Sequence, residues 1–149
     1  MATYWDTSCV VKLYCRESDS DWYLEALAAE AEPVRSSRLL EAELFFAFQM
    51  KWARGETGSE SPEDLFGHFL DDVGHGRFLL FPLGRDVIDE SRIVAQTCFA
   101  SRPTVPLRTL DGLHLATARV AKCERIFSTD ARMRKAAALL GFSPSENPG

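Results

Sequence analysis

The chain alternates between brief segments built on apolar side chains and longer segments in which apolar residues recur every three or four positions. The brief segments are typical of strands, and the longer ones of helices that bury one face. We predict strands at residues 2–5, 33–36, 78–81 and 125–128. The run Phe-Leu-Leu-Phe at 78–81 has no polar member, so we expect this strand to be buried on both faces of a parallel sheet.

The longer segments predict helices whose ends carry capping residues. Thr7 or Ser8 can cap the first helix, and Ser61 followed by Pro62 is typical of a helix start. Gly55 and Gly141 stand where helices are expected to end. The predicted helices run through residues 10–14, 22–27, 37–53, 62–74, 85–100, 109–122 and 130–140.

Strands that alternate with helices indicate an α/β fold with a parallel sheet. At 149 residues the chain is expected to be one domain, residues 1–149, with a helical hairpin at about 37–76. Hydrophobic content of 46% and charged content of 26% are ordinary for a globular protein and argue against disorder. No apolar run approaches the length of a membrane span, and the first residues do not resemble a signal peptide, so we expect a cytoplasmic protein.

The four cysteines, Cys9, Cys15, Cys98 and Cys123, have neither the spacing of a zinc site nor that of a disulfide framework. We interpret them as small, mostly buried thiols.

Charge is distributed unevenly along this acidic chain, whose net charge is -5. Residues 1–101 carry nine basic and 18 acidic side chains, whereas residues 102–135 carry eight basic and three acidic ones. A solvated charge distribution and a nucleic-acid contact both explain such a basic segment. The cations considered as RNA-phosphate contacts are Arg108, Arg119, Arg132, Arg134 and Lys135.

Four carboxylates occupy positions that an acidic metal pocket would use. Asp6 follows the first predicted strand, and Asp130 follows the last. Because ligands of a parallel sheet gather beyond the carboxyl ends of its strands, both acids are expected at the same edge. Asp111 lies in the first turn of a helix, where the helix dipole favours an anion. Glu43 has apolar neighbours three and four residues away and therefore points into the apolar stripe of its helix.

Clustered carboxylates repel one another, so a set of ionised acids is stable chiefly when a cation binds to it. Oxygen ligands without cysteine or histidine favour Mg²⁺ or Mn²⁺ over zinc. Such a site supports metal-assisted hydrolysis of a phosphodiester.

Four blocks around these acids resemble the PIN-domain nucleases, specifically the VapC-type toxins of toxin-antitoxin pairs. The blocks are Tyr-Trp-Asp-Thr-Ser-Cys-Val-Val-Lys-Leu-Tyr at 4–14, Leu-Leu-Glu-Ala-Glu-Leu at 39–44, Leu-Arg-Thr-Leu-Asp-Gly-Leu-His-Leu-Ala at 107–116 and Phe-Ser-Thr-Asp-Ala-Arg-Met at 127–133. They occur in the order of the family, and the resemblance extends over nearly the whole chain. The matched acids are Asp6, Glu43, Asp111 and Asp130.

The resemblance implies a three-layer α/β/α fold with four to five short strands. It also implies an endoribonuclease that uses Mg²⁺ or Mn²⁺, frequent homodimers, and a small cognate antitoxin protein. Ser128 matches a hydroxyl position that helps to bind the metal or its water, and Thr7 is a second supporting residue. A serine that ends a strand can also simply bond its own backbone, so both roles stay open for Ser128.

Several residues beside the acids have simpler interpretations. Glu41 projects in a different direction from Glu43 and is expected to be solvated. We interpret His114 as a packed helix residue rather than a general base, and His68 and His75 as structural.

Two further functions remain open at this stage. One is a PIN-domain ribonuclease of RNA maturation that has no antitoxin, and the other is a PIN-like binding module without catalysis. A phosphoaspartate phosphatase also begins with an acid after its first strand, but it needs a second acid two residues later, where this chain has Ser8.

Overall fold

The computed structural model describes residues 1–145, 147 and 148. In this part of the chain the strands β1 (Thr3–Trp5), β2 (Val34–Ser37), β3 (Phe78–Phe81) and β4 (Arg125–Phe127) form one sheet in the order β3-β2-β1-β4. All neighbouring strands run parallel. The predicted strands and the parallel sheet are therefore confirmed.

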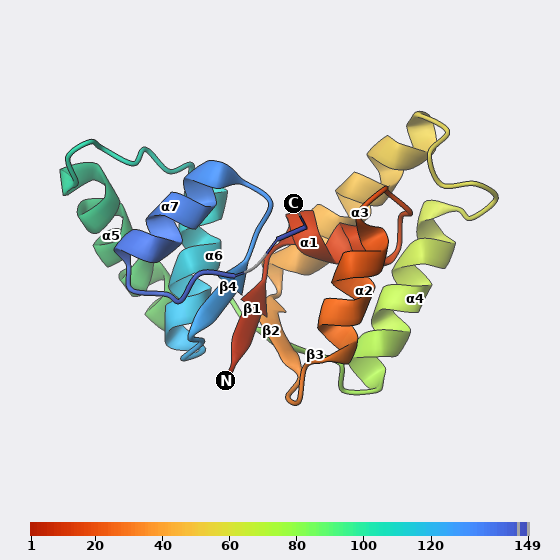
Figure 1. Cartoon of the computed structure of the whole chain (residues 1–149), viewed down its shortest axis with the longest axis horizontal. Helices are drawn as coiled ribbons and strands as arrows, with labels where there is room; N and C mark the ends of the chain where they lie inside the picture. The colour runs from red at the N-terminus through yellow and green to blue at the C-terminus, as the bar shows by residue number, and fades with distance from the viewer. Residues whose placement is uncertain (146, 149) are drawn as a thin grey trace.

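The helices cover both faces of this sheet. They are α1 (Thr7–Val10), the short 3-10 helix η1 (Val11–Leu13), α2 (Ser20–Ala28), α3 (Leu39–Ala53), α4 (Pro62–Gly74), α5 (Arg85–Ala100), α6 (Thr109–Val120) and α7 (Ala131–Leu139). Figure 1 shows α5, α6 and α7 on one side of the sheet and α1 to α4 on the other. This arrangement confirms the three-layer α/β/α fold.

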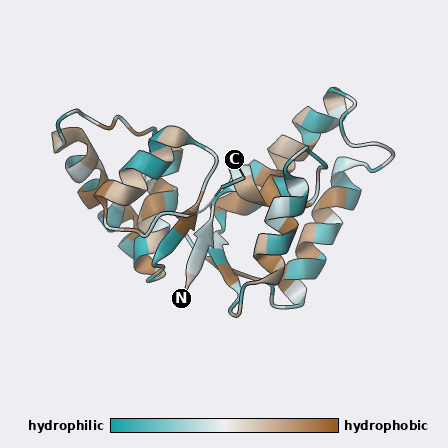
Figure 2. Cartoon of the chain, in the orientation of Figure 1, coloured by the Kyte–Doolittle hydropathy of each residue, from teal (hydrophilic) through white to brown (hydrophobic). Residues whose placement is uncertain are grey.

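Adjacent residues of β1 bury their side chains in different cores, as alternation along a strand requires. Tyr4 belongs to the apolar cluster made with α5, α6 and α7, whereas Trp5 belongs to the cluster made with α1 to α4. Both side chains are fully buried. Figure 2 shows that the surrounding helices carry hydrophobic and hydrophilic residues together, as helices with one buried face do.

Local sequence signals place most element ends correctly. Ser61 caps α4 in a reciprocal capping box with Asp64, and Pro62 is the first helical residue. Gly141 follows α7 with a φ of +90°, a backbone conformation that glycine adopts readily. The first helix differs from the prediction, because Asp6 rather than Thr7 or Ser8 is its N-cap.

The prediction that residues 78–81 are buried on both faces is wrong. Strand β3 lies at the edge of the sheet, and Leu79 is 48% exposed. An apolar run resembles a central strand in sequence, but the order of strands depends on contacts that local pattern does not contain.

Helices α3 and α4 pair with each other, and the loop between them reaches away from the sheet (Figure 1). The rings of Phe45 and Phe66 meet edge to face in this pair, with centroids 5.5 Å apart. All four cysteines are free and buried, as expected. Within the described residues, no helix is long and apolar enough to cross a membrane.

Candidate metal centre

Asp6 lies directly beyond β1, where the chain turns into α1. Its backbone N–H donates to the carbonyl of Phe127 over 3.1 Å, so the pairing of β1 with β4 extends to the acid. The side chain is only 6% exposed. Its Oδ1 accepts hydrogen bonds from the Ser8 hydroxyl over 2.5 Å and from the Cys9 backbone N–H over 3.4 Å.

Burial raises the pKa of Asp6 because the ionised form loses its hydration. The hydroxyls of Ser128 and Ser8 and the nearby His114 act in the opposite direction without cancelling the effect of burial. A cation bound at this edge would favour the ionised form of the carboxylate.

Asp130 follows β4 and is the N-cap of α7. Its Oδ1 accepts hydrogen bonds from the backbone N–H groups of Arg132 and Met133 over 2.8 and 3.0 Å. Its own N–H donates to the hydroxyl of Ser128, which is completely buried. Ser128 thus makes the bond to the backbone that a strand-ending serine can make, and it also contacts Asp6.

Ser8 joins the loops that follow β1 and β4. Its hydroxyl donates to Asp6 and accepts the N–H of Thr129 over 3.0 Å, although the two loops are 121 residues apart in sequence. The sequence predicted Ser8 as a possible helix cap and gave it no part in the acidic site. Its place two residues after Asp6 was the available signal.

Glu43 projects from α3 towards α1 and α6. Its Oε1 accepts hydrogen bonds from the Thr7 hydroxyl over 2.9 Å and from Nε2 of His114 over 2.5 Å. Burial alone would raise the pKa of Glu43, but His114 and Thr7 together hold this pKa below its usual value. Glu41, in contrast, pairs with Arg38 on the outer face of α3.

Asp111 lies in the first turn of α6 and faces the guanidinium of Arg108. Nε of Arg108 is 3.3 Å from Oδ2 of Asp111, and its terminal nitrogen is 3.9 Å from Oδ2 of Asp130. Arg108 is 74% exposed, so water screens both ion pairs. The guanidinium nevertheless shows that a positive charge fits between these two carboxylates.

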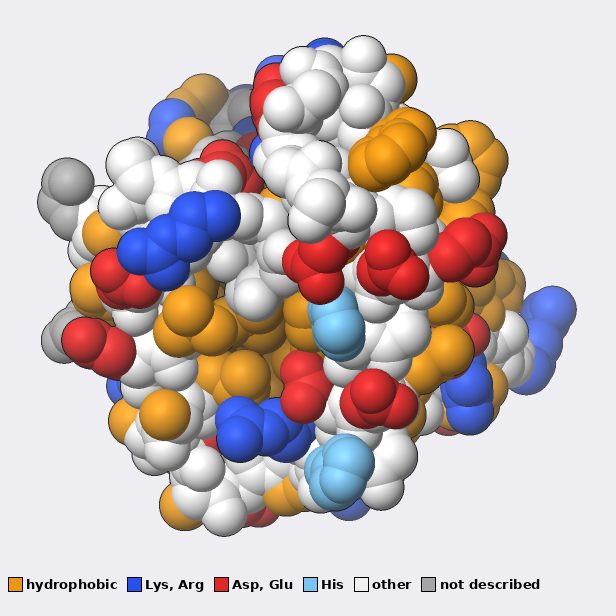
Figure 3. All heavy atoms as spheres, turned by 90° about the vertical axis from the view of Figure 1, so that its right-hand side faces the viewer, with side chains coloured by type: hydrophobic (Ala, Val, Ile, Leu, Met, Phe, Trp, Pro, Cys, Tyr) orange, Lys and Arg blue, Asp and Glu red, His pale blue; other side chains and the backbone are white. Residues whose placement is uncertain are grey.

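His114 is buried, as predicted, but it does more than fill space in α6. It is 2% exposed and bonds both Glu43 and the hydroxyl of Tyr4. The other two histidines contact none of the four candidate acids in the part of the chain that the structure describes. His68 pairs with Glu60 over 2.7 Å, and His75 bonds the backbone carbonyl of Asp71. Figure 3 shows the end of the molecule that carries α4, where histidine and acidic side chains gather beside an apolar hollow.

The basic candidates separate into three groups. Arg108, Arg132 and Lys135 line a groove of about 640 Å³ that also contains Asp130. Arg119 pairs with Glu90 of α5 over 2.6 Å. Arg134 lines a different depression, beside the segment that follows α7.

The contacts join the four acids in pairs. Ser8 links the loops of Asp6 and Asp130, Arg108 lies between Asp111 and Asp130, and the Thr7 that bonds Glu43 follows Asp6 directly. Among the described residues, no three or more Asp, Glu, His or Cys side chains form a ready-made group that could hold a metal ion. The structure therefore assembles the predicted residues at one edge without closing them into a ligand set.

The donor chemistry of this edge fits a hard divalent cation, because carboxylate and hydroxyl oxygens dominate it. On both Glu43 and Asp130, two hydrogen-bond donors converge on a single oxygen, Oε1 and Oδ1 respectively. Each side chain is thereby anchored through one oxygen, and the second oxygen of Asp130 already faces a cation, the guanidinium of Arg108 at 3.9 Å.

Comparison with known proteins identifies the class. Residues 3–139 match the PIN domain family. The chain is 31% identical over 144 residues to Ribonuclease VapC46 of Mycobacterium tuberculosis, with 95% of each chain covered. The chain belongs to the PIN-domain family. Within that family it is a VapC-type member, as the four sequence blocks predicted.

Solved structures with low sequence identity share this fold. A crystal structure of VapC20 from Mycobacterium tuberculosis, a Sarcin-Ricin loop cleaving toxin, has a TM-score of 0.68 at 10% identity and covers 95% of this chain and 97% of that one. A toxin-antitoxin complex from Klebsiella pneumoniae has a TM-score of 0.61 at 15% identity and covers 87% of both chains.

Proposed function

We propose that this protein is a metal-dependent endoribonuclease and the toxin of a type II toxin-antitoxin pair. The observation that carries the proposal is the joining of Asp6, Asp111 and Asp130 at one sheet edge through Ser8 and Arg108. The relationship to Ribonuclease VapC46 supports RNA as the substrate. The proposal also places the protein in the cytoplasm, where its substrate is found.

The residues that would hold Mg²⁺ or Mn²⁺ are Asp6, Glu43, Asp111 and Asp130, with Ser128 as a supporting hydroxyl. When bound, the ion neutralises charge that develops on the phosphate during hydrolysis. Thr7, Ser8 and the backbone N–H groups at the start of α7 keep the carboxylates in fixed orientations. A carboxylate of this set accepts the proton of the attacking water, whose oxygen bonds to phosphorus while the P–O bond to the leaving ribose oxygen breaks. The leaving oxygen takes up a proton from solvent water and departs as a hydroxyl group.

The groove beside Asp130 is the proposed path of the RNA backbone. Arg108, Arg132 and Lys135 supply positive charge along it, and Asp130 places the acids next to that charge. Arg119 and Arg134 were also candidates for phosphate contacts. We assign them no part in this path, because Arg119 pairs with Glu90 and Arg134 lines another depression.

Replacing Asp6 by Asn tests the enzymatic part of the proposal. Purified wild-type protein should cut RNA with Mn²⁺, and D6N should cut it at least about 10²-fold more slowly, since a buried anion of the site becomes neutral. D89N is the matched control, because Asp89 pairs with Arg85 on the outside of α5. Equal cutting by D6N and wild type would refute the assignment.

The proposed antitoxin and homodimer require a surface beyond the acidic edge. Phe46 and Met50, one turn apart on α3, are 76% and 56% exposed. Large exposed apolar side chains in such an arrangement suit a partner helix or a second copy. Light scattering of the purified protein, alone and after co-expression with the neighbouring small reading frame, measures both assemblies. A protein that stays monomeric and takes no partner would favour the ribonuclease of RNA maturation.

A further inference from the structure

A buried chain of hydrogen bonds connects the sheet to Glu43 through His114. The Tyr4 hydroxyl of β1 lies 2.6 Å from Nδ1 of His114 in α6, and Nε2 of His114 lies 2.5 Å from Oε1 of Glu43 in α3. These residues come from segments 110 and 71 positions apart. Tyr4 is fully buried and His114 is 2% exposed, so water does not compete with the chain at its inner end.

The chemistry of the three groups fixes the direction of each hydrogen bond. A carboxylate can only accept, so Nε2 of His114 must carry the hydrogen that it shares with Glu43. The other nitrogen of a neutral imidazole is an acceptor, and the hydroxyl of Tyr4 is a donor in reach of it. Glu43 therefore fixes the tautomer of His114, and Tyr4 supports this tautomer by donating to the other ring nitrogen.

His114 and Thr7 both donate to the same oxygen of Glu43. Oε1 takes both bonds, whereas Oε2 accepts none from the residues that the structure describes. Glutamate has three rotatable side-chain bonds, and two donors from different helices restrict them together. This convergence leaves one oxygen of Glu43 for an ion.

We propose that His114 is a positioning residue that fixes the carboxylate of Glu43 for metal binding, with Tyr4 supporting the tautomer that donates to Glu43. The inference rests on the proposed function only in taking Glu43 as a metal ligand. In this role His114 touches neither the RNA nor the reacting atoms. Its hydrogen bond to Glu43 distinguishes it from a residue that merely packs α6 against the sheet.

Partners that orient a metal ligand have a measurable effect, since their removal typically weakens metal affinity about 10-fold to 100-fold. A Leu at position 114 fills the space of the imidazole and cannot donate a hydrogen bond. A Gln can place an N–H donor near the position of Nε2. The pair H114L and H114Q thus separates packing from hydrogen bonding.

The test is titration calorimetry of the purified full-length protein with Mn²⁺ alone, after removal of metal by a chelator. H114L should bind Mn²⁺ about 10-fold more weakly than wild type, and H114Q should stay within a few fold of wild type. Y4F, which keeps the ring and removes only the hydroxyl, should lie between them. Melting curves verify that each variant is folded, and if H114L does not fold, the comparison of Y4F with H114Q decides.

Three results have distinct meanings. Wild-type affinity in folded H114L, or in Y4F if H114L is unfolded, overturns the positioning role alone. An H114Q variant as weak as H114L also overturns it, because a donor at that place then has no effect. Equal Mn²⁺ affinity in wild type and E43Q overturns the role of Glu43 in the proposed function, and the inference falls with it.

Discussion

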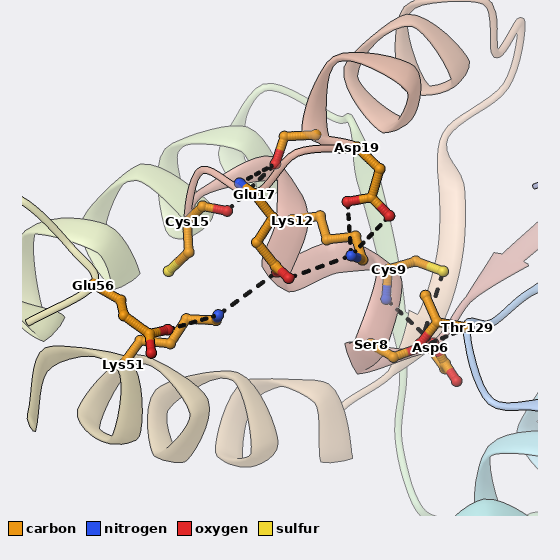
Figure 4. Close-up of polar contacts among 11 residues, drawn as sticks. Asp6, Ser8, Cys9, Lys12, Cys15, Glu17, Asp19, Lys51, Glu56 and Thr129 are labelled. Carbon is orange, nitrogen blue, oxygen red and sulfur yellow. Dashed lines mark hydrogen bonds and ion pairs between the residues drawn. The ribbon is translucent and has the colours of Figure 1, made fainter. Parts of the chain in front are cut away.

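Two groups of buried or half-buried charges lie side by side around α1, and different partners hold them. Lys12 bonds Asp19 over 2.8 Å and Glu17 over 3.4 Å, and Lys51 lies within 3.6 Å of both Glu17 and Glu56. Figure 4 shows this network beside Asp6, whose contacts with Ser8 and Cys9 involve no cation. The lysines pair with acids, whereas Asp6 and Glu43 depend mostly on neutral donors.

The difference indicates what each group is for. In the lysine network, opposite charges hold the segment before α2 against η1 and against the end of α3, which is a structural task. At the acidic edge, Arg108 is the cation that bridges two of the acids among the residues that the structure describes, and it is 74% exposed. Neutral donors orient carboxylates without cancelling their charge, so the edge keeps its attraction for a cation. We therefore expect mutations in the two groups to affect different properties.

The largest expected effect separates the two tasks of Asp130, which caps α7 and is a proposed metal ligand. D130S keeps an oxygen for the cap, so stability should stay within about 0.5 kcal/mol of wild type, whereas D130A should lose about 1 kcal/mol. RNA cleavage should fall at least about 10²-fold in both. Urea unfolding and single-turnover cleavage measure the two quantities. An active D130S protein would show that the cap is the only task of this carboxylate.

The next effect is on stability and belongs to the lysine network. K12M removes the cation that faces Asp19 and Glu17, and Lys12 is only 12% exposed, so unfolding should become easier by about 2 kcal/mol. R16M is the matched control, because the pair of Arg16 with Asp21 is about 70% exposed, water screens it, and its removal should leave stability almost unchanged. Mn²⁺ affinity should not change in either protein. If K12M weakened Mn²⁺ binding instead, the separation between the groups would be wrong.

Local sequence pattern accounts for most of the fold because element ends depend on nearby residues. The capping box at Ser61 and the turn at Gly141 are encoded within a few positions. Asp6 and Asp130 could be assigned to one edge because parallel strands place their carboxyl ends together. These inferences need only the order of strands and helices along the chain.

The remaining features depend on contacts between distant segments. Ser8 meets Thr129 across 121 positions, and His114 meets Tyr4 across 110. A histidine on the buried side of a helix is consistent with packing, and nothing local indicates that Glu43 lies within its reach. The edge position of β3 escaped prediction for the same reason. The candidate acids could thus be predicted, but the donors that orient them could not.

A smaller effect compares two acids of the edge with each other. Burial raises the pKa of Asp6, so this carboxyl group holds its proton more tightly in the folded protein than in the unfolded chain. In metal-free protein, stability should therefore fall as pH rises from the unfolded pKa through the folded pKa. D6N should therefore be more stable than wild type at neutral pH, and the difference should vanish in acid. The pKa of Glu43 is lowered, so wild type should exceed E43Q in stability at neutral pH and lose that advantage as pH falls through the folded pKa. Melting temperatures between acidic and neutral pH in a chelator test both signs, and equal signs would contradict the contrast.

The smallest expected effect concerns Arg108, which bridges Asp111 and Asp130. Because Arg108 is exposed and its ion pairs are screened, R108A should change the stability of the metal-free protein by less than about 1 kcal/mol. If Arg108 instead contacts RNA in the groove, the slope of log affinity against log salt should decrease by about 0.7 in R108A, measured in the D6N background so that the RNA stays intact. R119A should keep the full slope, because Arg119 is engaged by Glu90. A decrease in R119A and none in R108A would place the RNA on another face. Arg108 would then be bound to the acids without serving the RNA, and this difference between the acidic edge and the lysine network would not exist.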